Sequence, residues 1–229
     1  MPVTVDSGER RPWPLPVFGL AGSIASGKTT LARELERLGA VVIDADRVGH
    51  AVMRRGSPAW RKVRAEFGRR VAPADGPVDR ARLGAVVFGD ASARRRLEGL
   101  LHPAIESALR ARVDRVAREG FAIVVIEAAL LPESGLDLSL DGLAVVVSKR
   151  AAQVGRLVRS RGMGRAEARR RIAAQWEAGR KTARATWIVR NDGDPSDLAL
   201  EASRLWRDMR AHPAALAAKR RSGTVRRRR

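Results

Sequence analysis

The sequence predicts an α/β fold in which a parallel sheet is flanked by helices. Short apolar runs alternate with amphipathic stretches along the 229 residues, as they do when helices connect parallel strands. A glycine-rich turn follows the first apolar run, residues 17–21, and Asp44 and Asp46 lie at the end of the second, residues 40–44. Because ligands of such sheets bind at the carboxyl ends of the strands, these two features are expected to share one site.

The glycine-rich turn has the spacing of a phosphate-binding P-loop, with glycine at the first and sixth positions followed by Lys28 and Thr29. Glycines let backbone N–H groups surround phosphate oxygens, and the positive end of the next helix faces the same ligand. Lys28 is expected to reach the β- and γ-phosphates of ATP, and the Thr29 hydroxyl to bind Mg²⁺. The predicted ATP-binding residues of the loop are Gly22, Ser23, Ile24, Ala25, Ser26, Gly27, Lys28, Thr29 and Thr30.

The next elements continue the alternation. Leu31, Leu35 and Leu38 recur at helical spacing after the loop, and Gly39 ends this helix. Further strands are predicted at residues 121–126, 142–147 and 186–189, a pair of basic helices at 151–181 split by Gly162 and Gly164, and a final helix at 195–209.

The section between residues 47 and 120 has a mostly helical pattern. Its segments are 57–68, 79–88 and 90–120, and Pro103 is expected to interrupt the last of them. Residues 1–16 are rich in proline and charge and predict a loosely attached arm. From residue 212 the chain is a basic tail that is expected to be disordered.

Asp44 and Asp46 are two residues apart, so at a strand end their side chains are expected to lie on the same side. Phosphoryl transfer to a hydroxyl needs a carboxylate that accepts the proton and orients the oxygen, and Asp46 is the stronger candidate. An Asx turn or a helix cap for the segment that starts at Arg47 is the alternative for one of the two.

Arg156 and Arg161 belong to a basic helix that ends at Gly-Met-Gly. Arginines on a hinged flap close over a triphosphate and neutralise charge in the transition state, whereas a solvated basic face is the alternative. His102 precedes Pro103 in an apolar stretch, where a ligand contact and a structural role are both open.

The net charge of +20 comes from forty arginines and only five lysines. Nucleic acid and small phosphate ligands would both be attracted, but arginine on solvated faces is an equally simple explanation. Aromatic residues make up only 4%, which weakens the nucleic-acid interpretation. The absence of cysteine excludes disulfides and thiolate chemistry. No apolar run reaches the roughly 18 residues of a membrane span and no secretory signal is recognisable, so a cytoplasmic protein without a membrane partner is expected.

Several separated stretches together resemble the dephospho-CoA kinase family, in order and with compatible spacing from residue 17 to about residue 209. The matching stretches are GSIASGKTT, VIDAD, FG, DGPVDRARL, VVFGD, LEGLLHPAI, the segment with Gln153, Arg156 and VRSRG, the spacing of Gln175 and Lys181, and IVRNDG.

This resemblance implies transfer of the γ-phosphoryl group of ATP, with Mg²⁺, to the 3′-hydroxyl of dephospho-CoA. It implies that Asp46 is the acceptor-orienting base, with Lys28 and Arg156 also catalytic, and that Asp44 and His102 lie beside the acceptor. Arg156 and Arg161 would contact ATP from a lid, and Asn191 would lie on the adenine side.

The resemblance also implies a domain organisation: a P-loop kinase domain at 17–211, with an acceptor subdomain at 47–120 and a lid at 151–180. The arm at 1–16 and the tail at 212–229 lie outside the resemblance. The chain departs from the family pattern at Ser23 and Ala25, which replace glycines, and in the segment ALLPE, 129–133. A P-loop kinase for another nucleoside or nucleotide, and a nucleotide-responsive nucleic-acid-binding protein anchored by its tail, are therefore the rival functions. The sequence makes no prediction of the oligomeric state.

Overall fold

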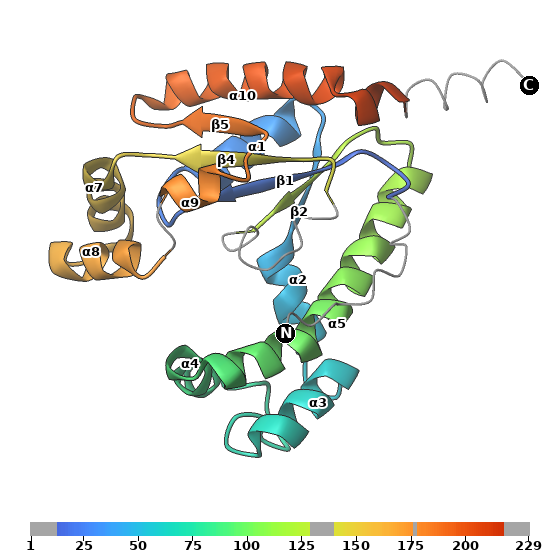
Figure 1. The fold of residues 1–229 in the computed structure, drawn as a ribbon, viewed down its shortest axis with the longest axis vertical. Coiled ribbons are helices and arrows are strands. Elements are labelled where there is room, and N and C mark those ends of the chain that lie inside the picture. The colour runs from blue at the N-terminus through green and yellow to red at the C-terminus, as the bar shows by residue number, and fades with distance from the viewer. Residues whose placement is uncertain (1–12, 129–139, 176–177, 218–229) are drawn as a thin grey trace, which may run out of the picture. The chain divides into compact units, whose positions relative to one another are not determined.

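The computed structural model describes residues 13–128, 140–175 and 178–217, shown in Figure 1. The chain divides into two compact units: Ile43–Arg112 form one, and the residues before and after them form the other. Each unit has its own buried apolar cluster. The altered segment 129–133 lies outside the described residues.

A five-stranded sheet with the order β2-β3-β1-β4-β5 is the centre of the unit formed by the residues before and after Ile43–Arg112. Its central strand β1 pairs in parallel with β3 on one side and with β4 on the other, and every residue of β1 is buried. The α/β class predicted from the sequence is confirmed. The strands are β1 (Val17–Gly22), β2 (Val41–Asp44), β3 (Val124–Glu127), β4 (Gly142–Val147) and β5 (Trp187–Arg190).

Two helices, α1 (Lys28–Arg37) and α10 (Pro195–Ala211), cover the sheet in a common core. Both carry apolar residues at helical spacing, so each presents one apolar stripe to the strands. The buried members of these stripes are Leu31 and Leu35 of α1 and Leu198, Ala202, Leu205 and Met209 of α10. This packing fixes α1, and therefore the loop that precedes it, against the sheet.

The predicted pair of basic helices is confirmed as α7 (Arg150–Arg161) and α8 (Arg165–Ala173). Gly162 ends α7 in a left-handed conformation, with φ 59°, and Gly164 is the N-cap of α8. Buried residues of both helices, among them Leu157 and Ile172, form a small separate cluster. A short third helix, α9 (Ala178–Thr182), follows them and was not distinguished in the sequence.

The unit Ile43–Arg112 is helical: α2 (Ala45–Val52), α3 (Pro58–Phe67), α4 (Arg80–Gly89) and the first part of α5 (Ala91–Arg118). Its core includes Trp60, Val63 and Leu83. The expected interruption at Pro103 is wrong, because α5 continues through the proline. Buried Leu101 and Leu109 on either side of the proline hold the helix in place despite the missing N–H donor.

The basic tail was expected to begin at residue 212, and this boundary is wrong. Residues 213–217 are helical, and Ala215 is buried in the core of the sheet. The ring of His212 packs edge-on against Phe18 and Trp187, at centroid distances of 5.3 and 5.8 Å. Aromatic and small apolar side chains thus attach this segment to the sheet, and the remaining tail, 218–229, lies outside the described residues.

The predicted arm also ends earlier than residue 16. Pro16 is buried, and its carbonyl accepts a hydrogen bond of 3.0 Å from the N–H of Val124 at the start of β3. Within the described part of the chain, no helix is both long enough and apolar enough to cross a bilayer.

Candidate active site

The loop between β1 and α1 has the backbone that its glycines predict. Gly27 has φ 97°, and a Cβ there would collide with the Asn191 amide. A Cβ on Gly22 would lie 2.6 Å from Ser26 Oγ and 3.0 Å from the carbonyl oxygen of Val146. Both ends of the motif therefore require glycine on steric grounds, and the loop is held close to β4.

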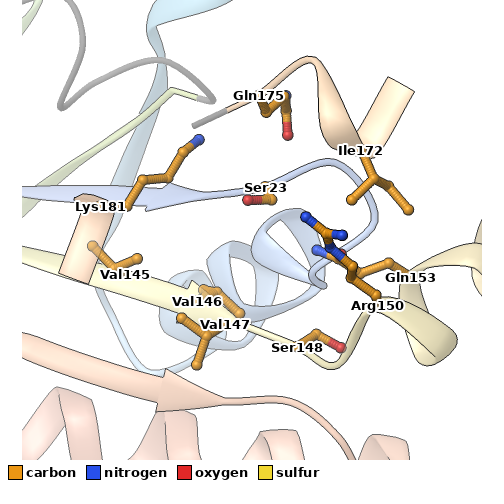
Figure 2. A pocket seen from close by; sticks show the side chains of 10 residues that line it. All are labelled: Ser23, Val145, Val146, Val147, Ser148, Arg150, Gln153, Ile172, Gln175 and Lys181. Atoms are coloured by element: carbon orange, nitrogen blue, oxygen red, sulfur yellow. The ribbon is translucent and has the colours of Figure 1, made fainter. Parts of the chain in front are cut away.

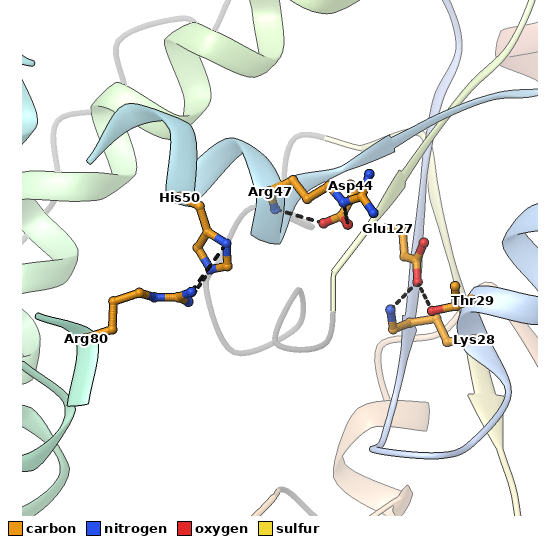
Figure 3. Close-up of polar contacts among 7 residues, drawn as sticks. All are labelled: Lys28, Thr29, Asp44, Arg47, His50, Arg80 and Glu127. Carbon is orange, nitrogen blue, oxygen red and sulfur yellow. Dashed lines mark hydrogen bonds and ion pairs between the residues drawn. The ribbon is translucent and has the colours of Figure 1, made fainter. Parts of the chain in front are cut away.

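The loop lysine and threonine both bind one buried carboxylate, that of Glu127 (Figure 3). Lys28 Nζ lies 2.5 Å from Glu127 Oε1, and Thr29 Oγ1 donates to the same oxygen at 2.8 Å. Glu127 is the last residue of β3 and only 7% exposed. Glu127 was not among the residues predicted from the sequence, although a lone acid that ends a buried strand was an available signal, because a buried charge needs partners.

This arrangement suits a divalent cation shared with phosphates. A threonine hydroxyl and a carboxylate are the oxygen ligands that Mg²⁺ prefers, and here they are already within hydrogen-bond distance of each other. Lys28 has three N–H donors, so it can keep its bond to Glu127 and still donate to phosphate oxygens. The donor set fits the Mg²⁺ expected at Thr29. Thr30, the last residue of the predicted set, is exposed on α1 and makes no hydrogen bond with a described residue.

Three polar side chains from outside the loop, those of Arg156, Gln175 and Asn191, bind its backbone, and Ser148 bonds to two of them; we call these four residues the loop clamp. Asn191 Nδ2 donates to the carbonyl of Ser26 at 2.7 Å, and Gln175 Oε1 accepts from the N–H of Ile24 at 2.7 Å. Arg156 Nη1 donates to Ser148 Oγ at 3.0 Å, and Arg156 Nη2 to the carbonyl of Asn191 at 2.9 Å. The clamp connects α7, α8 and the end of β5 to the loop.

Arg156 also donates to the carbonyl of Ala25 at 3.2 Å, so its guanidinium is directed to the loop backbone. Arg161, near the end of the same helix, is exposed and makes no hydrogen bond or ion pair with any described residue. Of the two predicted lid arginines, Arg156 therefore shapes the loop, whereas Arg161 is available for a ligand.

A small cavity of about 70 Å³ opens beside the loop at the carboxyl end of β4 (Figure 2). Ser23 lines it from the loop, and polar residues of the α7–α9 region face it from the other side. Two of these, Gln153 and Lys181, are only 4% and 1% exposed. Buried polar groups are retained where they have partners, so this cavity extends the polar surroundings of the loop toward α7 and α8.

Comparisons with known proteins show the family of the chain. A family model described as "Dephospho-CoA kinase" matches residues 16–197. The chain is 42% identical over 190 residues to a dephospho-CoA kinase of Geobacter sulfurreducens, covering 83% of this chain and 96% of that protein. It is 44% identical over 194 residues to the dephospho-CoA kinase of Anaeromyxobacter dehalogenans, covering 85% and 92% of the two chains. This chain belongs to the dephospho-CoA kinase family.

Solved structures agree on the fold. The crystal structure of TT1252 from Thermus thermophilus has 30% identity and a TM-score of 0.64, covering 86% of this chain and 98% of that one. A dephospho-CoA kinase from Campylobacter jejuni has 24% identity and a TM-score of 0.61, covering 84% and 96%. Relatives of nearly equal length therefore share both the sheet and its helices.

The residues that carry the family resemblance in the second half of the chain converge on the loop. Gln153, Gln175 and Lys181 all line the cavity beside Ser23, although up to 28 positions separate them in the sequence. Gln175 is also a member of the loop clamp. These three residues of the sequence pattern that pointed to the dephospho-CoA kinase family thus line one cavity beside the loop.

The two aspartates differ in their surroundings. Asp44 is the N-cap of α2: its Oδ1 accepts from the N–H of Arg47 at 2.9 Å, and its Oδ2 lies 3.3 Å from Arg47 Nε. The capping alternative is therefore confirmed for Asp44. The chain becomes helical at Ala45, so the expectation that both side chains extend from a strand on one side is wrong.

Asp46 lies in the first turn of α2, is exposed, and makes no hydrogen bond or ion pair with a described residue. A carboxylate is favourable near a helix N-terminus, but no contact occupies its oxygens. His102 lies half-buried inside α5, also without a hydrogen bond to the described part of the chain. Both side chains are available for a ligand of the helical unit.

Replacing Glu127 by glutamine is expected to raise the Mg²⁺ concentration needed for half-maximal activity by about tenfold or more, because residues around a metal site tune its affinity on this scale. The measurement is activity against free Mg²⁺ at saturating ATP. Glu34→Gln on α1, which removes a carboxylate paired with Arg37 on the surface, is the control. An unchanged Mg²⁺ dependence would contradict a role of Glu127 at the metal.

The Ala25→Gly variant tests whether replacement of a family glycine impairs the loop. Ala25 has φ 56°, a left-handed conformation that costs a non-glycine residue about 1–2 kcal/mol. Its methyl group packs against the α7–α8 cluster, which contributes about 0.8 kcal/mol, and glycine adds about 0.5–1 kcal/mol of unfolded-state entropy. These effects nearly cancel, so the free energy of unfolding is expected to change by less than about 1 kcal/mol in denaturant titrations. A larger gain on mutation would show that the loop is strained by Ala25.

Proposed function

We propose that the chain transfers the γ-phosphoryl group of ATP to the 3′-hydroxyl of dephospho-CoA and so produces coenzyme A. Membership of the dephospho-CoA kinase family over nearly the whole chain carries this proposal. The intact loop, with Lys28 and Thr29 joined to Glu127, supports it.

Phosphoryl transfer depends mainly on positioning and charge, since it requires little covalent chemistry from the protein. The N–H groups of the loop and the start of α1 bind the β-phosphate, and Lys28 donates to the β- and γ-phosphates. Thr29 and Glu127 would hold the Mg²⁺ ion. When bound, this ion supplies positive charge to the phosphates of ATP.

The remaining predicted residues have proposed roles on either side of the reaction. Asp46 accepts the proton of the 3′-hydroxyl and orients its oxygen, because its carboxylate is free whereas that of Asp44 caps a helix. His102 contacts the acceptor. Asp44 lies beside the acceptor because it is close to Asp46 in the chain, but its carboxylate caps α2. Arg161 contacts the phosphates of ATP, while Arg156 acts with Asn191 to keep the loop in its binding conformation. Asn191 also borders the adenine side. ATP as co-substrate is consistent with a cytoplasmic location.

The proposal is tested by incubating the purified protein with ATP, Mg²⁺ and dephospho-CoA, with adenosine and AMP as rival acceptors. Selective formation of coenzyme A is the expected result. Phosphorylation of adenosine or AMP in preference to dephospho-CoA would instead support a kinase of another acceptor. ATP binding without any transfer, together with nucleic-acid affinity that decreases steeply with salt, would favour the nucleic-acid-binding alternative.

A further inference from the structure

We propose that His50 and Arg80 bind the 5′-diphosphate of dephospho-CoA and thereby select this acceptor over nucleosides. The inference rests on the proposed function and adds to it a specificity site within the unit Ile43–Arg112. In dephospho-CoA the 3′-hydroxyl and the 5′-diphosphate belong to the same ribose, so a protein that orients the hydroxyl has the diphosphate close by.

The two residues form a basic pair on the surface of this unit (Figure 3). Arg80 is the first residue of α4, and its guanidinium contacts both ring nitrogens of His50 on α2, with Nη1 at 3.4 Å from Nδ1. Both side chains are exposed. Two groups that can each carry positive charge thus meet where an anion from solvent can reach them.

No carboxylate among the described residues compensates Arg80. Two of the aspartates near the pair in sequence already have partners: Asp44 is paired with Arg47, and Asp79 with Arg82 at 3.2 Å. Both of these aspartates also cap a helix, so their oxygens are occupied twice. Arg80 therefore has no acidic partner among the described residues, and its guanidinium has the forked N–H donors that bind phosphate oxygens. The ring of His50 beside it offers a further N–H, so the two together suit a diphosphate.

The position of the pair relative to Asp46 favours the same ligand. Asp46 and His50 are four residues apart on α2, and residues at this spacing are neighbours on one helix face, about 6 Å apart along the axis. Asp46 and His50 therefore lie one turn apart on one face of α2, and Arg80 of α4 contacts His50. A ribose whose 3′-hydroxyl meets Asp46 can direct its 5′-phosphates to His50 and Arg80.

The test is steady-state kinetics with dephospho-CoA varied at saturating ATP and Mg²⁺. Arg80→Ala and His50→Ala are each expected to raise KM for dephospho-CoA by about tenfold or more, as expected for lost charge-assisted hydrogen bonds, with KM for ATP unchanged. Arg80→Lys, which keeps the charge but not the fork, is expected to fall between wild type and Arg80→Ala. Inhibition by adenosine, which has the ribose but no phosphate, is expected to stay the same in all variants.

Arg82→Ala is the matched control, because Arg82 lies on the same helix but is already paired with Asp79. If KM for dephospho-CoA rises as much in Arg82→Ala as in Arg80→Ala, the rise comes from the lost surface charge and not from a specific site. This result would overturn the inference. An unchanged KM for dephospho-CoA in Arg80→Ala, with a lower unfolding temperature, would show that the contact only joins α2 to α4 and would also overturn it. If wild type forms no coenzyme A, the proposed function itself fails, and the inference fails with it.

Discussion

Replacing Lys28 by alanine is expected to lower kcat/KM for coenzyme A formation by about a thousandfold, since one preorganised charge at the transferring phosphoryl group is worth this much. ATP affinity, measured by direct titration, is expected to decrease as well. The structural reason is that Lys28 is held beside the loop by the buried Glu127 at 2.5 Å, with side-chain exposures of only 13% and 9%. Because Lys28 is held in a fixed position, another basic side chain cannot take over its contact to the phosphates.

The Lys28–Glu127 ion pair means that Lys28→Ala also affects stability, so the experiment needs a control for folding. Removing Lys28 leaves the Glu127 carboxylate with the Thr29 hydroxyl as its one hydrogen-bond partner among the described residues, and breaking a buried pair on one side costs about 3 kcal/mol of stability. The double variant Lys28→Ala with Glu127→Gln removes the unpaired charge. We expect it to recover most of the unfolding free energy but none of the activity. Recovery of activity in the double variant would show that Lys28 acts on folding and not on ATP.

The parts of the fold that are encoded locally could be predicted from the sequence. Gly27 and Gly162 have left-handed backbones that glycine adopts easily, and Gly22 leaves no room for a Cβ. The order of strands and helices followed from apolar periodicity, which depends on neighbouring residues. The P-loop was predictable for the same reason, because all its contacts to phosphate come from consecutive residues.

Contacts between distant segments were not predictable. Glu127 meets Lys28 because β3 pairs with β1, and 99 positions separate the two residues. Arg156 is a second example. The sequence permitted either a lid contact or a solvated face for this residue, but α7 packs so that the Arg156 guanidinium reaches the loop backbone. The position of His212 in the core depends on two aromatic rings from β1 and β5. In each case tertiary packing selected among alternatives that were locally equivalent.

Asp46→Asn is expected to lower kcat for coenzyme A formation by about a thousandfold, within the range of a lost general base, with ATP affinity unchanged. Asparagine keeps the size of the side chain and its place in the first turn of α2, so folding is expected to be preserved. Asp114→Asn, which changes another exposed aspartate on α5, is the control and is expected to retain wild-type activity.

The decisive measurement for Asp46 separates formation of ADP from formation of coenzyme A. The loop, Thr29 and Glu127 do not depend on Asp46, so slow hydrolysis of ATP by water is expected to continue in the Asp46→Asn variant while transfer to dephospho-CoA is lost. A parallel loss of both reactions would place Asp46 in ATP binding. Wild-type transfer would exclude it as the base and leave the free carboxylate on α2 with no catalytic role. The ratio of the two products therefore distinguishes a residue that orients the acceptor from one that merely stabilises the end of a helix.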